Sequence, residues 1–541
     1  LLLMALTIGV GANILVDPEQ LEKDPTHIIV SGAVLAGGAL LVHVVLWIRA
    51  RYADPYLLPI AVALNGLGLA MIHRIDLSTG QTAANTQVVW TAVAMVTCCV
   101  VLWFLKDHRR LRNVTYTMLL LSVVLLLLPM VPGLGVEING ARLWISVAGR
   151  TFQPGEIAKI TLAIFFAGYL SMNRDLILLA GRKVGPVRLP RFKDIAPMLA
   201  AWLIAIGVLV LQKDMGTAIM FFGLFLAMLY LATGRLGWIV LGLVLMLVGG
   251  FAASRIFSHV SLRLDAWLSA FDPEVYTRSP GGSAQIVQGL FGLASGGLFG
   301  QGLGQGRPDL VSYANSDMII TAFGEELGLI GLSAILVMFL LFASRGLRAA
   351  LGTRDAFGKL LAGGLSALMV LQLFIVVGGV TRLLPLTGLT TPFMSAGGSS
   401  LLSNWIIVAI LLAISHSARR PVATGPATDE DLASVERRRR AREEQRAQDG
   451  DAAEREPATQ PTPSAALASS AEPLDAAAHD AAGPGSATEV MSRLTTRTDA
   501  AERGTRGEEG ATARPASSAA DDTAEANSRT GRAADEEGGT P

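Results

Sequence analysis

Twelve apolar stretches divide the first 420 residues, and each is long enough, or nearly so, to cross a bilayer as a helix. A membrane-spanning helix needs about 20 predominantly apolar residues. The stretches are 1–16, 28–48, 56–73, 87–105, 114–131, 156–171, 195–211, 216–232, 236–255, 317–343, 358–380 and 396–416. Only 16% of the residues are charged, whereas soluble proteins carry about 25%. The sequence therefore predicts an all-α polytopic membrane protein and excludes a soluble multidomain one.

The net charge of zero conceals two parts of opposite charge. Residues 1–420 contain 30 Lys and Arg against 20 Asp and Glu, and residues 421–541 contain 14 against 24. The second part has few aromatic or β-branched clusters, so it cannot bury enough apolar surface to offset chain entropy. We therefore expect a disordered tail over 417–541. At the other end, Leu1 replaces an initiating Met, and we expect a membrane helix with a truncated start rather than a signal peptide.

Lys and Arg are distributed unequally between alternate loops. The loops after the even-numbered stretches carry most of them, with clusters in 106–112 and 174–193. Because cytoplasmic loops accumulate positive charge, we expect a multi-pass protein of the cytoplasmic membrane with both termini, and hence the tail, in the cytoplasm. The outer loops are then 132–155, 212–215, 256–316 and 381–395.

Ionisable residues at the edge of membrane helices are costly and therefore mark candidate sites. Glu156 and Lys159 open the sixth stretch, and their spacing places them on one helix face. They form either an ion pair that lets the helix begin or a site for an anionic ligand. Asp214 precedes the eighth stretch, where it either caps the helix or contributes to an outer site. Arg142, in an outer loop, can pair with a lipid phosphate.

The long outer loop and the stretch that follows it contain further candidates. The loop has a glycine-dense part, which permits close backbone approach to a ligand or a helix, and Gln285 and Gln288 lie in it. Asp317 follows at the outer start of the tenth stretch, where it either caps the helix or takes part in chemistry. Glu325 and Glu326 would lie about 12–13 Å deeper at 1.5 Å per residue, where they need a polar neighbourhood or protonation.

The outer loop before the last stretch, 384–400, contains two prolines and three glycines. These residues predict a re-entrant or broken helix that lines a cavity, and Ser399 lies near its end. The acid–lysine pair, the acid at a helix start and this loop together indicate one outer cavity. The sequence shows no Cys/His cluster that would indicate a zinc site.

Five motifs contain most of these candidates. They are FQPGEIAK (152–159), QKDMGTA (212–218), GGLFGQGLGQG (296–306), SDMIITAFGEELG (316–328) and PLTGLTTPFMSAGGSS (385–400). In this order they resemble the SEDS proteins, the RodA/FtsW/SpoVE family of bacterial cell-wall polymerases, and most closely its actinobacterial RodA branch. Gly155, Lys213 and Ala284 depart from the family pattern. The resemblance implies a core of ten transmembrane helices over 56–416, preceded by about two extra helices in 1–55.

The resemblance also implies an activity, namely that of a peptidoglycan glycosyltransferase in a bacterial membrane. Such an enzyme joins lipid II, an undecaprenyl-diphosphate-linked disaccharide peptide, into β-1,4 glycan strands at the outer face during cell elongation. Asp317 matches the essential acid of the family, and Glu156 and Lys159 match its polar pair. Supporting or substrate-binding residues are then Arg142, Asp214, Gln285, Gln288 and Ser399.

The implied reaction is one inverting displacement at the sugar. It needs a base for the acceptor hydroxyl, which the carboxylate of Asp317 can supply. It also needs positive charge near the departing diphosphate, from Lys159, an arginine or a divalent cation such as Mg²⁺ or Mn²⁺. We expect a cation such as Lys159 to help keep Asp317 ionised.

Partners and alternatives follow from the same resemblance. The chain has no soluble transpeptidase domain, so a class B penicillin-binding protein is the expected cross-linking partner, and membrane lipids rather than nucleic acid surround the protein. One alternative is a lipid II flippase, whose site should lie near the midplane and be reachable from both faces. The others are a division-type (FtsW) polymerase and a non-catalytic scaffold for other wall enzymes.

Overall fold

The computed structural model describes residues 1–16 and 25–421, except for 139, 148, 180–181, 185–186 and 190–191. The tail predicted to be disordered lies outside the described residues, apart from its first few positions. Those positions continue the last helix, which ends at Arg419 rather than at 416. A basic side chain in the last turn favours this extension, because it complements the negative end of the helix dipole.

All twelve predicted stretches form helices, and the predicted all-α polytopic membrane fold is confirmed. Among the described residues, nine helices are long and apolar enough to cross a membrane. They are α3 (Thr26–Arg49), α4 (Leu57–Thr79), α5 (Ala83–Phe104), α8 (Gly155–Leu179), α10 (Met215–Thr233), α11 (Gly237–Ile256), α15 (Ile319–Gly352), α16 (Ala356–Val380) and α17 (Gly398–Arg419). The other three stretches form the shorter helices α1 (Leu2–Val16), α7 (Thr115–Leu127) and α9 (Phe192–Leu211).

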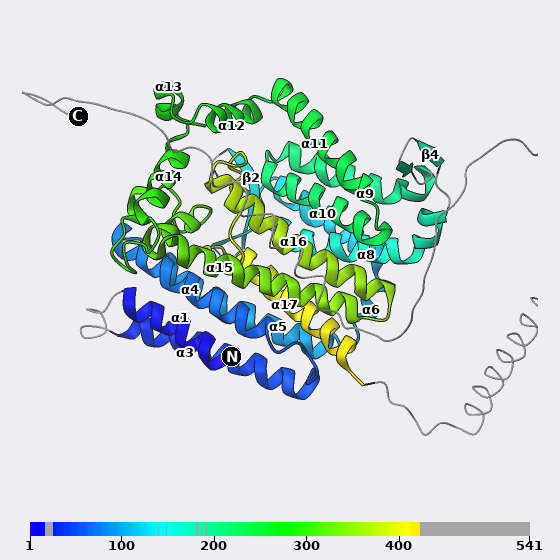
Figure 1. Cartoon of the computed structure of the whole chain (residues 1–541), viewed down its shortest axis with the longest axis horizontal. Coiled ribbons are helices and arrows are strands. Elements are labelled where there is room, and N and C mark those ends of the chain that lie inside the picture. Colours follow the sequence, from blue (N-terminus) through cyan, green and yellow to red (C-terminus); the bar gives the residue numbers. More distant parts are fainter. Residues whose placement is uncertain are drawn as a thin grey trace, which may run out of the picture. The chain divides into compact units, whose positions relative to one another are not determined.

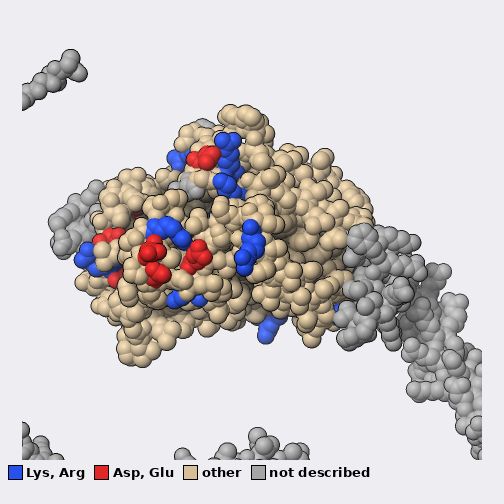
Figure 2. All heavy atoms as spheres, turned by 90° about the horizontal axis from the view of Figure 1, so that it is seen from above, with Lys and Arg blue, Asp and Glu red and all other residues tan. Residues whose placement is uncertain are grey.

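The helices lie side by side as a bundle, with α1 and α3 along one flank and α8 to α11 along another (Figure 1). Burial differs strongly between them: 83% of the most apolar part of α4 is buried, against 6% for α11. The buried α4 can carry Asn65 and Asp76 because it faces protein, whereas the lipid-facing α11 has almost no polar side chains. Figure 2 shows one face of the molecule, where charged side chains gather toward one end and leave a broad uncharged area.

The first two helices pack against the following ones through small and polar residues. A Cβ atom added to Gly9 of α1 would lie 2.8 Å from the Cα of Gly66 in α4, so the two backbones touch. Asn13 Nδ2 donates a hydrogen bond of 2.7 Å to Ser31 Oγ of α3. Both are typical of helix association inside membranes, where small residues allow close approach and polar side chains bond across helices.

The loop 132–155, which the sequence predicts to face outward, folds into a small antiparallel sheet that the sequence analysis did not predict. Its strands are β1 (Gly135–Ile138), β2 (Ala141–Val147) and β3 (Arg150–Phe152), in the order β1-β2-β3. Trp144 pairs with Val136, and Ile145 with Phe152. Bulky aromatic and β-branched residues favour strands, and a glycine with positive φ lies at each of the two turns.

The remaining elements are short and lie in the loops. They are α6 (Arg110–Asn113), η1 (Leu128–Met130), the hairpin β4 (Arg182–Val184) and β5 (Val187–Leu189), and, in the long outer loop, α12 (Ser258–Leu268), α13 (Pro273–Thr277), α14 (Ala284–Gly296) and η2 (Pro308–Leu310). The long outer loop is therefore largely helical, and α14 packs along α15.

Helix α15 is broken at Gly328, where φ is 66°. The glycine-dense segment lies against this break: Leu329 N donates to Gly297 O, and a Cβ on Gly328 would lie 2.6 Å from Leu298 O. The part after the break, 329–352, rises about 36 Å at 1.5 Å per residue, which is enough to cross the hydrocarbon core. Glu325 and Glu326 therefore lie in the short part of α15 before the break, and the part after the break is by itself long enough to span the membrane.

These two acids bind the backbone of the glycine-dense segment. Glu325 accepts a hydrogen bond of 2.8 Å from Arg307 N, and Glu326 accepts one of 2.8 Å from Gly304 N. Glu326 also pairs with Arg74 of α4 at 3.1 Å. The polar neighbourhood that the two acids need is thus supplied by backbone amides and one arginine.

We expect Gly9→Ala to lower the stability of the folded protein by about 1–3 kcal/mol, because the added methyl group overpacks the contact with Gly66. Gly11→Ala is the matched control, since nothing lies within 4 Å of a Cβ at that position. The measurement is the thermal unfolding midpoint of both variants in detergent. Equal midpoints for the two variants would contradict the packing of α1 on α4.

Candidate active site

Asp317 lies in the turn directly before α15 and does not cap that helix. The N-cap position belongs to Met318, without a side-chain capping bond. The carboxylate of Asp317 instead accepts hydrogen bonds from Ser316 Oγ at 3.1 Å and from Gln285 Nε2 of α14 at 3.4 Å. The capping alternative is therefore wrong. The structure instead places Asp317 in contact with Gln285, which the sequence analysis also selected.

The surroundings of Asp317 act on its pKa in opposite directions. Burial raises the pKa above the ordinary value, and this effect is the largest. Hydrogen bonds from Ser316 and Gln285 and the charge of Arg263 lower the pKa in part. The result is a carboxylate that is more basic than an exposed aspartate, because burial disfavours its charged form.

Arg263 on α12 supplies the positive charge at this site, and the sequence analysis missed it. Its Nη1 donates to the backbone oxygens of Leu386 and Thr387 at 3.3 and 3.1 Å. Burial lowers the pKa of its guanidinium, and the charges of Asp214 and Asp317 oppose that effect. An arginine stays protonated in proteins, so Arg263 is a fixed cation that interacts with both carboxylates. No motif marks it, and only the fold brings α12 beside the start of α15.

Asp214 caps α10, which is one of the two roles that the sequence left open. Its Oδ1 accepts a hydrogen bond of 2.9 Å from Thr217 N, which caps α10. Burial raises its pKa most, and Thr217 and then Arg263 lower it. The start of α10 also packs on the loop that Arg263 binds, since a Cβ on Gly216 would lie 3.0 Å from Thr387 O.

Glu156 and Lys159 form the predicted ion pair at 2.6 Å, with Lys159 fully buried. Lys159 Nζ also donates to Gln372 Oε1 of α16 at 3.1 Å and to Asn404 Oδ1 of α17 at 3.4 Å. Ser403 Oγ donates to Glu156. An ammonium group has three donors, and three acceptors occupy them here.

The structure therefore argues against the two roles expected of Lys159, which are to place positive charge near the diphosphate and to keep Asp317 ionised. With all three donors occupied, Lys159 has none left for a diphosphate, and the cation that acts on Asp317 is Arg263. Of the sources of positive charge considered from the sequence, the geometry favours the arginine. Lys159 instead connects three helices.

The predicted break before the last helix is present as an irregular loop over 381–397, which is buried mainly over 389–395. Its polar groups are bound from several helices. Gln372 Nε2 donates to Thr390 O at 2.8 Å, and Gln87 Nε2 of α5 donates to Ser395 O at 3.1 Å. Ala396 N donates to Asn315 O at 2.8 Å. The loop therefore links the Lys159 network to the segment that carries Asp317.

The other predicted site residues differ in their placement. Gln288 lies in α14, and its buried Oε1 has no hydrogen-bond partner among the described residues. Ser399 is buried in the first turn of α17. Arg142 lies on β2, exposed, and pairs with Glu137 at 3.0 Å. Of the residues predicted to support the site, Gln285 thus contacts Asp317, whereas Arg142 lies on the separate sheet.

A divalent cation would find few protein ligands at this site. Within the described ranges, no group of three His, Cys, Asp or Glu residues is arranged to hold a metal ion. Mg²⁺ commonly binds through one or two carboxylates together with substrate phosphates. Asp214 and Asp317 are the carboxylates that would contribute to such binding.

Comparison with known proteins shows which family the chain belongs to. The sequence profile of the family described as cell cycle protein, FtsW/RodA/SpoVE, matches residues 55–420. Peptidoglycan glycosyltransferase RodA of Mycobacterium tuberculosis is 48% identical over 437 residues, which cover 79% of this chain and 91% of that protein. RodA of Mycobacterium leprae is 46% identical over 433 residues, with coverage of 79% and 91%.

A more distant relative and a solved structure extend the likeness. Stage V sporulation protein E of Bacillus subtilis is 32% identical over 317 residues, covering 58% of this chain and 82% of that protein. A chain from a peptidoglycan synthase complex shares the fold with a TM-score of 0.56 at 23% identity, covering 68% of this chain and 99% of that chain. The chain belongs to the FtsW/RodA/SpoVE family of cell cycle proteins, the family that its five motifs predict.

Proposed function

We propose that this chain is a peptidoglycan glycosyltransferase that polymerises lipid II into β-1,4 glycan strands at the outer face of the membrane during cell elongation. The mycobacterial relatives named RodA, at 46–48% identity, support the activity and the elongation role. A relative named FtsW is 31% identical, so the division-type alternative is less well supported. The observation that carries the proposal is the carboxylate of Asp317, held between Gln285 and the charge of Arg263.

The reaction replaces a bond from the donor sugar to its diphosphate by a bond to the acceptor hydroxyl. As that bond forms, the hydroxyl proton passes to the carboxylate of Asp317, whose raised pKa makes it a better base. The departing diphosphate carries the negative charge, which the guanidinium of Arg263 stabilises from its fixed position. Arginine suits this role because its planar fork matches phosphate oxygens.

Glu156 and Lys159 act in this proposal as positioning residues. Their network fixes α16, α17 and the irregular loop, whose backbone oxygens in turn hold Arg263. The flippase alternative would need a site reachable from both faces. The candidate residues instead lie at one set of helix ends, directly before α10 and α15.

We infer the cytoplasmic location of both termini from the charge distribution. The ends of the bundle that carry α6 and the link between α15 and α16 are rich in Arg, as cytoplasmic loops are. A class B penicillin-binding protein as transpeptidase partner is supported by the structure of similar fold, which comes from a complex that coordinates polymerization and crosslinking.

Asp317→Asn should abolish detectable polymer, because loss of a general base costs roughly 10²–10⁴-fold in rate. The assay incubates the purified variant with lipid II and separates the glycan products by size. Asp309→Asn is the matched control: it removes an outer-loop carboxylate that pairs with Arg307 rather than with Arg263, and it should polymerise normally. Polymer formation by Asp317→Asn within a few-fold of wild type would return Asp317 to a structural role.

Arg263→Gln should lower turnover by roughly 10²-fold, as expected when one preorganised donor to a developing anion is removed. The charge of Arg263 lowers the pKa of Asp317. Its removal therefore raises that pKa, and the acidic limb of the pH–rate profile should move to higher pH. Arg263→Lys keeps the charge and should keep the limb in place. Arg255→Gln, at the exposed end of α11, serves as the control, and an identical limb in all four proteins would contradict the role.

The orientation predicts the labelling of single cysteines in intact cells. Ser295→Cys in α14 should react with an impermeant maleimide, whereas Asn113→Cys in α6 should react only after the membrane is disrupted. The native Cys98 and Cys99 are buried and should give little background. The reverse pattern would mean that the termini face outward.

A further inference from the structure

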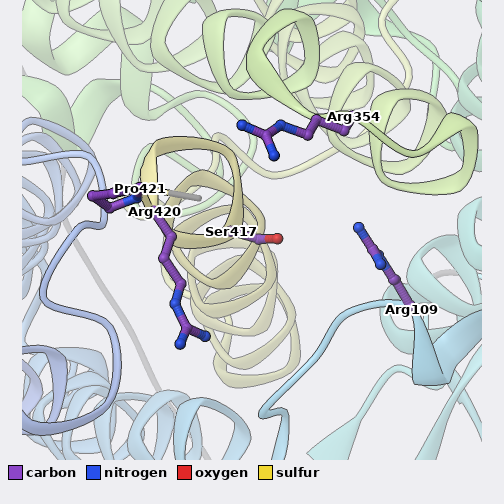
Figure 3. A pocket seen from close by; sticks show the side chains of 5 residues that line it. All are labelled: Arg109, Arg354, Ser417, Arg420 and Pro421. Carbon is purple, nitrogen blue, oxygen red and sulfur yellow. The ribbon is translucent and has the colours of Figure 1, made fainter. Parts of the chain in front are cut away.

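The ends of three helices line an open cavity of about 160 Å³, and its lining residues, Arg109, Arg354, Ser417, Arg420 and Pro421, are all exposed. Arg109 precedes α6, Arg354 lies between α15 and α16, and the others lie at the end of α17. Figure 3 shows Arg109, Arg354 and the hydroxyl of Ser417 around the same space, with Arg420 beside α17. Segments far apart in the sequence thus bring the guanidinium groups of Arg109 and Arg354 to one cavity, which Arg420 also lines.

The positive charge of this cavity is only partly balanced by the protein. Arg109 Nε lies 3.3 Å from Asp355 Oδ1. That carboxylate also bonds His108 Nε2 at 2.9 Å and Gly358 N at 2.7 Å. Arg354 and Arg420 form no side-chain hydrogen bond or ion pair within the part of the chain that the structure describes. Because like charges repel, a cavity with this excess of guanidinium is more stable with an anion in it.

We propose that this cavity binds the phosphate of an anionic phospholipid from the inner leaflet. Guanidinium groups bind phosphate oxygens in pairs, and the hydroxyl of Ser417 adds a donor. The cavity lies where α17 ends at Arg419 and α16 begins at Ala356, which is the level of lipid headgroups. Basic pockets between membrane helices on the cytoplasmic side recognise such headgroups.

The acidic tail is the competing occupant, and the sequence favours the lipid over it. The tail begins in the wall of the cavity at Pro421. Residues 422–428 carry no acid, and the first carboxylates are Asp429 and Glu430. Seven residues without an acidic side chain therefore separate Pro421 from the first carboxylate of the tail, whereas a phospholipid carries its negative charge on the headgroup itself. The leaflet assignment rests on the orientation proposed above, but binding in detergent does not depend on that orientation.

The test measures lipid binding to the full chain in detergent by native mass spectrometry. The probes are short-chain phosphatidylglycerol, short-chain phosphatidylcholine and inorganic phosphate, titrated separately. Wild type should bind phosphatidylglycerol, and Arg354→Gln should bind it about tenfold more weakly or worse, as expected for a lost charge-assisted bond. Arg348→Gln is the matched control, because it removes the same charge from an arginine that does not line the cavity. It should bind like wild type.

Each other outcome overturns the proposal. Equal binding of phosphatidylglycerol to all three proteins would place the lipid elsewhere. Inorganic phosphate as effective as phosphatidylglycerol would make the cavity a general anion site. Binding that appears only after protease has removed the tail would assign the cavity to the tail. Lipid binding is measured without lipid II, so failure here leaves the polymerase proposal untouched.

Discussion

Lys159 is a fully buried ammonium group in a membrane bundle, and such a group is very costly unless it is paired and hydrogen-bonded. It finds acceptors on its own helix, on α16 and on α17, through Glu156, Gln372 and Asn404. These partners cannot separate without leaving a charge uncompensated. The relative placement of three helices, and of everything attached to their outer ends, depends on this pairing.

The irregular loop before α17 is tolerated for the same reason. Backbone that is not helical must satisfy its polar groups within the protein when it lies among membrane helices. Gln87 and Gln372 bond its carbonyl groups from two helices, and Arg263 bonds two more from the outer loop. The loop therefore holds Arg263 in place. Asp317 and Asp214 therefore interact with a cation, Arg263, whose position is fixed by backbone oxygens rather than by the two carboxylates.

Positive charge serves different ends at the two sides of the bundle. At the end of the bundle that carries Asp317, one arginine interacts with two carboxylates and donates to two carbonyl groups, so its charge is largely compensated. At the opposite end, Arg354 and Arg420 have no ion-pair partner among the described residues, and Asp355, the carboxylate that Arg109 contacts, already has other partners. The first arrangement suits a reaction in which charge develops, and the second suits a ligand that is permanently anionic.

The sequence by itself determined the helices and the family, because apolar length and motif order are local properties that need no knowledge of packing. It also selected Asp317, Asp214 and the Glu156–Lys159 pair, since ionisable residues at membrane helix ends stand out against an apolar background, and it selected Gln285 because this residue lies in the glycine-dense loop. Only the tertiary structure decided which of them act together. Arg263 and Gln372 lie outside the motifs, and Arg263 comes near Asp317 only when α12 folds back over the bundle end. The break at Gly328 likewise depends on the glycine-dense segment that packs against it, a contact between two parts of the chain that neither part reveals alone.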